Sequence, residues 1–73
     1  MIRCHLSRLL GERRIRAADV YRDTGINKGT LSRMYNEKLL RVDLEILDKL
    51  CDYLDCSVGD LLEYQKKETS REM

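Results

Sequence analysis

The 73-residue sequence predicts an all-α fold built from five short helices. Apolar side chains recur three or four residues apart in five successive segments, which is the spacing of one helix face. Capping residues stand at the start of three of these segments. No segment alternates apolar and polar residues over a length that would indicate a β-strand. A chain of this length forms one small domain, with little space for both a core and a deep catalytic pocket.

The first expected helix begins near Ile2 and includes Arg13 at helical spacing, and Gly11, a residue type that weakens helices, falls near its end. Its apolar residues share one face: Ile2, Leu6, Leu9 and Leu10. Cys4 and His5 fall within this helix and point in directions about 100° apart. We therefore predict that they do not act together as a nucleophile and its base.

Two short helices follow, separated by a turn of about three residues. The second helix covers residues 17–24 and ends at Gly25, which can adopt the left-handed conformation found after the last turn. The third begins after Asn27, whose side chain can accept a hydrogen bond from a free amide of the first turn. Ile26 and Leu31 have the spacing of a hydrophobic staple across that cap.

The last two helices begin in the same way. Asp43 is expected to cap the fourth helix, and Ser57 the fifth, where Asp60 completes a capping box. The staple pairs are Val42 with Leu47, and Cys56 with Leu61. The apolar faces are Leu44, Leu47, Leu50, Cys51 and Leu54 in the fourth helix, and Val58, Leu61 and Leu62 in the fifth. Residues 1–64 form the predicted domain, and residues 65–73 are predicted to be a flexible polar tail.

Composition argues against several other classes of protein. Three cysteines without a CxxC pair, and a single histidine, do not supply a disulfide framework or a zinc site: Cys4, Cys51, Cys56 and His5. We expect reduced thiols near the core of a cytoplasmic protein. No apolar run approaches the about 20 residues of a membrane span, and five arginines in residues 2–16 argue against a secretory signal. The sequence predicts no enzyme activity, metal, cofactor, small-molecule ligand or membrane association.

The second and third helices have the spacing of a helix-turn-helix, whose second helix enters the major groove of DNA. One side of the third helix carries Thr30, Leu31 and Met34. The other side is polar or basic and contains no acid: Lys28, Gly29, Ser32, Arg33 and Asn36. Such side chains can donate to base edges, and Asn36 and Lys38 suit phosphates. An ordinary solvated helix face is the alternative, but the turn, the cap and the missing acids favour DNA.

The sequence also resembles the lambda-repressor-like (Xre/Cro) helix-turn-helix family, in particular its small stand-alone members. The resemblance rests on TGINKGTLSRMYN at 24–36, on VDLEILDKLCDYLDCSVGDLLEY at 42–64, and on an opening helix that ends in GERRI. It covers nearly the whole chain up to Tyr64. It implies a compact five-helix domain that binds double-stranded DNA as a homodimer and regulates transcription.

The resemblance implies specific contacts for the helix at 28–36 and its surroundings. The base-facing residues would be Lys28, Gly29, Ser32 and Arg33, with Thr30 at their edge. The phosphate contacts would be Arg14, Arg16, Ala17, Asn36, Lys38 and Arg41. The family places a polar side chain where this chain has Ala17, so we expect Arg14 or Arg16 to replace it by charge.

Two further residues depart from the family pattern. Tyr21 stands where the family prefers alanine at the crossing of the two helices, which predicts either a looser crossing or a ring turned outward. Glu37 stands where glycine often follows asparagine, and an acid beside phosphates would lower affinity. Tyr35 is expected either to pack on the first helix or to donate its hydroxyl to a phosphate.

The predicted function is that of a transcriptional repressor that reads a short palindromic operator as a dimer. The candidate dimer residues are Leu39, Leu40, Tyr53 and Tyr64, although one leucine could instead tuck under the fourth helix. The alternative is a protein-interaction module, or an antitoxin-type protein that binds a partner, with weak or no DNA binding. The missing polar side chain at Ala17 and the small net charge favour this alternative slightly.

The net charge of +1 conceals an uneven distribution. Residues 1–42 hold ten Lys/Arg and four Asp/Glu, a net of +6, whereas residues 43–73 hold four and nine, a net of −5. The basic half contains the expected DNA-reading helix. Such a division would orient the domain toward a polyanion with its first three helices forward.

Overall fold

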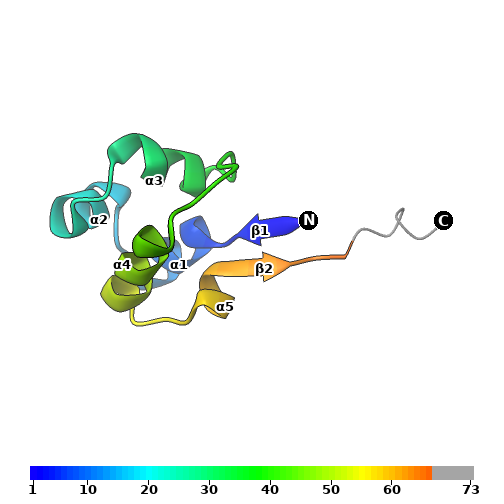
Figure 1. Cartoon of the computed structure of the whole chain (residues 1–73). Helices are drawn as coiled ribbons and strands as arrows, with labels where there is room; N and C mark the ends of the chain where they lie inside the picture. The colour runs from blue at the N-terminus through cyan, green and yellow to red at the C-terminus, as the bar shows by residue number, and fades with distance from the viewer. Residues whose placement is uncertain (67–73) are drawn as a thin grey trace.

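The computed structural model describes residues 1–66, and within them five helices and two short strands follow one another (Figure 1). In chain order these are β1 (Ile2–Cys4), α1 (Leu6–Arg13), α2 (Ala17–Thr24), α3 (Lys28–Tyr35), α4 (Leu44–Leu54), α5 (Val58–Leu61) and β2 (Leu62–Tyr64). None of the helices in residues 1–66 is long and apolar enough to cross a membrane.

Local signals in the sequence set most helix boundaries. Gly25 ends α2 with a φ of 76°, in the left-handed region that the sequence predicts. The Asn27 side chain accepts a hydrogen bond from Thr30 N at 3.1 Å and so caps α3. Ser57 and Asp60 form the predicted capping box of α5. Asp43 occupies the predicted position before α4, but its side chain makes no capping hydrogen bond.

The two strands correct the prediction of a strictly all-α fold. Ile2, expected in the first helix, pairs with Tyr64 in an antiparallel ladder that also joins Cys4 to Leu62. Leu62 was assigned to the fifth helix and instead opens β2. Cys4 therefore lies in a strand and not in the first helix, and the position before α1 is occupied by His5. A three-residue strand is too short to show an alternation, so its pairing with a distant segment decides its conformation.

The pairing of β1 with β2 continues one residue beyond the predicted domain boundary. The amide of Gln65 donates to the carbonyl of Met1 at 2.8 Å, and the amino group of Met1 donates back to the Gln65 carbonyl at 2.6 Å. Figure 1 shows β1 and β2 side by side, extending away from the helices. Residues 67–73 of the predicted tail lie outside the described residues.

One apolar core joins all five helices. Its buried members are Leu6, Leu9, Leu10, Val20, Ile26, Leu31, Met34, Leu47, Leu50, Leu54 and Leu61. Burial of each such side chain contributes about 1.5–3 kcal/mol. No charged or polar residue among positions 1–66 is fully buried. Cys4 and Cys56 pack against this core, and burial raises the pKa of both thiols. In α2 the core residue is Val20, and in α3 the core residues are Leu31 and Met34, so each of these helices contacts the core through one face.

Candidate DNA-binding surface

A rigid turn joins α2 to α3. The Thr24 hydroxyl donates to the carbonyl of Val20 at 2.6 Å and accepts from the amide of Ile26 at 3.2 Å. The amide of Gly25 donates to the Tyr21 carbonyl at 3.0 Å. Ile26 is buried, so the residue at the centre of the turn is anchored in the core. These contacts fix the direction in which α3 leaves α2.

The two sides of α3 differ as the sequence predicts. Leu31 and Met34 are buried, and Gly29 and Thr30 are half-buried. The side chains expected to meet DNA are exposed along the outer side and just after it: Lys28, Ser32, Arg33 and Asn36. No carboxylate is present on α3 itself. The helix therefore presents hydrogen-bond donors to the solvent and keeps its apolar side on the core.

Gly29 lies on this surface beneath two polar side chains. A Cβ atom there would lie 3.1 Å from Asn27 Oδ1, which is the capping oxygen, and 3.5 Å from Arg33 Nη1. The Arg33 guanidinium thus lies along the helix over Gly29. A larger residue at Gly29 would crowd the helix cap and displace this guanidinium.

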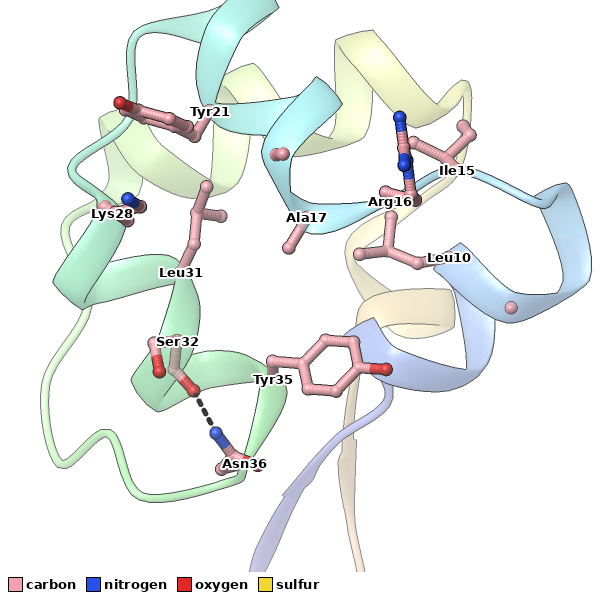
Figure 2. A pocket seen from close by; sticks show the side chains of 12 residues that line it. Leu10, Ile15, Arg16, Ala17, Tyr21, Lys28, Leu31, Ser32, Tyr35 and Asn36 are labelled. Atoms are coloured by element: carbon pink, nitrogen blue, oxygen red, sulfur yellow. Dashed lines mark hydrogen bonds between the residues drawn. The ribbon is translucent and has the colours of Figure 1, made fainter.

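A groove of about 480 Å³ separates the outer side of α3 from the start of α2 (Figure 2). Its floor is apolar and includes Leu10 and Leu31, while polar groups stand along its edges. Figure 2 shows Tyr35 reaching from α3 across the groove toward α1. The ring is 43% exposed, so packing on α1 and a hydroxyl contact to a phosphate both stay predictions.

Arg16 and Ala17 line the groove at the beginning of α2. The first amides of a helix have no partner within the helix and point toward this end. The Arg16 side chain is 85% exposed, and its Nε lies 3.9 Å from an Asp19 oxygen. Arg14 ends α1 with a φ of 55° and is also exposed. Both arginines predicted to compensate for Ala17 are therefore near the start of α2 and accessible.

Tyr21 has its ring turned outward, which is the second of the two outcomes expected for it. The side chain is 41% exposed, and the Lys28 ammonium lies 5.3 Å from the centre of the ring. This is the geometry of a cation–π contact. Figure 2 shows the two side chains next to each other at one end of the groove. Tyr21 thus contacts a predicted base-reading residue, a relation that sequence reasoning did not identify.

The segment after α3 carries three predicted phosphate contacts. The Asn36 side chain donates to the carbonyl of Ser32 at 2.9 Å (Figure 2) and closes the end of α3. The Lys38 amide donates to the carbonyl of Arg33 at 2.7 Å. The side chains of Lys38 and Arg41 are exposed. The three residues therefore lie in the segment that follows α3.

Glu37 lies within this segment but is neutralised by a residue that the sequence analysis left aside. The Arg3 guanidinium donates to both Glu37 carboxylate oxygens, at 2.8 and 2.9 Å. The amide of Cys4 donates to Oε1 at 3.1 Å. These donors lower the pKa of Glu37 to about 2. No local signal pointed to Arg3, because its strand was not predicted.

The four residues proposed for a dimer contact have different surroundings. Leu40 is 97% exposed, and Tyr64 is exposed on β2. Leu39 packs against the core, so one leucine of the pair does tuck inward. The hydroxyl of Tyr53 donates to Asp23 Oδ2 at 2.6 Å, which ties α4 to α2. Only Leu40 and Tyr64 therefore present large exposed apolar surfaces.

Comparison with known proteins gave two matches. A family model described as the Cro/C1-type HTH DNA-binding domain matches residues 5–67. A curated protein of Bacillus subtilis (strain 168), named as the uncharacterized HTH-type transcriptional regulator YozG, is 32% identical over 60 residues. The alignment covers 82% of this chain and 71% of that protein. No solved structure matches the chain.

Proposed function

Because the chain belongs to the Cro/C1-type helix-turn-helix DNA-binding family, we propose that it is a transcriptional repressor that reads a short palindromic operator as a dimer. The observation that carries this proposal is the outer side of α3. It combines exposed donors with an absence of acids, and a turn anchored in the core holds it in place.

In the proposed complex, α3 enters the major groove and its side chains contact base edges. Arg33 or Lys28 would donate to a guanine, Ser32 would pair with a neighbouring base, and Gly29 would allow the backbone to approach. Thr30 stands at the edge of this set. These contacts would determine which sequence is bound.

The phosphate contacts would lie on both sides of the groove that borders α3. Arg14, Arg16 and the amide of Ala17 would hold one stretch of the backbone. Asn36, Lys38 and Arg41 would hold another. Because these contacts neutralise phosphates and release counterions, binding should weaken steeply as salt is raised.

The exposed leucine in the loop after α3 supports a dimer on DNA. Leu40 projects into solvent, and Leu44 is 81% exposed at the start of α4. Exposed apolar patches on a protein surface indicate interaction sites, and these two leucines would contribute to such a patch. A symmetric contact through Leu40 would place two copies of α3 on one side of the duplex, as a palindrome requires.

A protein-interaction module, including an antitoxin-type protein, is the second candidate. Two observations favour it: Ala17 offers no polar side chain to a phosphate, and the net charge of the chain is only +1. The basic balance of residues 1–42 supports the first candidate instead, since that half contains α2 and α3.

Selection from a random duplex pool tests the proposal directly. The expected result is a palindromic consensus whose half-sites lie about 34 Å apart, one helical turn of DNA. Leu40→Ser, which adds no charge beside Lys38 and Arg41, should then bind a single half-site normally but lose the added affinity of the second half-site. Failure to enrich any sequence would favour the interaction module, and a consensus without symmetry would exclude the palindromic operator.

A further inference from the structure

Glu37 is an acid within the group of proposed phosphate contacts that follows α3. It lies between Asn36 and Lys38, which both belong to the predicted phosphate-binding set. A free carboxylate in this place would repel the DNA backbone. The family pattern often has glycine here, so the charge is a feature of this chain that the helix-turn-helix itself does not explain.

The backbone turns the Glu37 side chain toward β1. Its φ of 57° is left-handed, a conformation that is uncommon for a residue with a side chain. In this conformation both carboxylate oxygens reach β1, where they accept from the two donors of Arg3 and from the amide of Cys4. The contact joins residues 34 positions apart in the sequence.

We infer that Arg3 is a positioning residue for DNA binding, because its guanidinium holds the Glu37 carboxylate on β1 and neutralises it beside the phosphate contacts. This inference rests on the proposed function. The two-donor geometry supports it, since a planar guanidinium matches a carboxylate in a way that a lysine does not. The lowered pKa of Glu37 is in keeping with such a pairing.

Arg3 and Glu37 remain partly exposed, at 40% and 34% of their side chains. A partly exposed pair adds little to stability, because water competes with both partners. Its main consequence is therefore electrostatic. Without Arg3, the negative charge of Glu37 would have no cationic partner. It would lie next to Lys38, at the end of α3 that is proposed to approach the DNA backbone.

The test compares the affinity of four proteins for the selected duplex, measured by fluorescence anisotropy at two salt concentrations. They are the wild type, Arg3→Ala, Arg3→Ala with Glu37→Gln, and Arg3→Ala with Asp55→Asn. The last is a matched control, because it has the same net charge as the other double variant but keeps Glu37. Asp55 is exposed and ends α4 in a left-handed conformation that asparagine tolerates.

Arg3→Ala should weaken binding about three- to tenfold, more at low salt than at high salt. Glu37→Gln should restore most of this loss in the Arg3→Ala background, whereas Asp55→Asn should restore little. Equal affinity of the two double variants would overturn the inference. Thermal melts establish that each protein is folded at the assay temperature.

Arg3→Lys provides a second measurement if Arg3→Ala does not fold. It keeps the charge but loses the paired donors, so its affinity should lie between those of the wild type and Arg3→Ala. The single variant Glu37→Gln should bind at least as tightly as the wild type, and weaker binding would also overturn the inference. A wild-type protein that binds no duplex would overturn the proposed function, and this inference with it.

Discussion

Arg33 is the exposed residue of α3 whose geometry best suits reading of a base. Its guanidinium already lies along the helix, near Gly29. It can present two parallel donors, which is the pattern that guanine accepts in the major groove. Lys38, five residues later, lies beyond the end of α3 and carries an ammonium without this planar pair of donors.

Replacement of Arg33 by alanine should therefore cost about 1–3 kcal/mol in binding to the selected duplex and relax the preference at one base position. Lys38→Ala is the contrasting variant: it should weaken all sequences alike and reduce the slope of the salt dependence by about one. Titration of both variants against the consensus and its single-base changes measures the two effects. Unchanged discrimination in Arg33→Ala would remove this residue from the reading set.

Single residues also mark the limit of prediction from sequence. Tyr21 and Glu37 stand out in the sequence as departures from the family, but their effects depend on partners. The Lys28 ammonium lies over the ring of Tyr21, seven residues earlier in the chain. Glu37 meets Arg3 in a strand that no local pattern indicated. Alternative outcomes for Tyr21 could be stated in advance. Neutralisation of Glu37 could not, because it requires the three-dimensional pairing of distant segments.

At the scale of one element, α3 depends on its cap more than a long helix would. It has eight residues, too few for a stable helix in isolation. The Asn27 oxygen satisfies one of the free amides at its start, that of Thr30. The rest of its stability comes from burial of two side chains, Leu31 and Met34.

Asn27→Ala should lower the free energy of unfolding by about 0.5–2 kcal/mol, because the amide of Thr30 loses its acceptor. Asn27→Ser is the control, since serine caps helices about as well as asparagine. Urea denaturation of the three proteins provides the comparison. If the alanine and serine variants are equally stable, the cap contributes nothing and the core alone holds α3.

Elements with local signals could be predicted, and elements without them could not. Gly25 predicted the end of a helix, and Asn27 and Ser57 each predicted the start of one, because these signals depend only on neighbouring residues. The structure has these helix boundaries at the predicted positions. The strands differ because their conformation comes from pairing between the two ends of the described chain. Ile2 also had the spacing of the first helix, so the sequence favoured the wrong assignment there.

Over the whole molecule, the paired strands link the two ends of the described chain to the candidate DNA-binding surface. β1 and β2 join the start of α1 to the end of α5, and Arg3 joins β1 to the segment after α3. The charge division follows this arrangement, with the +6 half carrying β1 to α3 and the −5 half beginning at the cap of α4. The Arg3–Glu37 ion pair, which depends on pH, therefore joins two segments within the basic half.

The Arg3–Glu37 pair should make only a small contribution to stability, because both side chains are partly exposed, and acid should remove that contribution. The folded-state pKa of Glu37 is about 2, below the ordinary value of 4.5, so the ionised carboxylate favours the folded state. This contribution is present above pH 4.5 and is lost as the pH falls through that value toward about 2. The difference in unfolding free energy between wild type and Glu37→Gln should therefore shrink between pH 6 and pH 2.

Urea denaturation at several pH values in this range measures that difference, and an Arg3→Ala background provides the control. Hydrogen bonding from Arg3 is the largest cause of the lowered pKa, so without Arg3 the same substitution should show much less dependence on pH. A difference that stays constant down to pH 2 in the wild-type background would mean that Glu37 is not held by Arg3 in solution. β1 and β2 would then be joined to the candidate DNA-binding surface by backbone and core contacts alone.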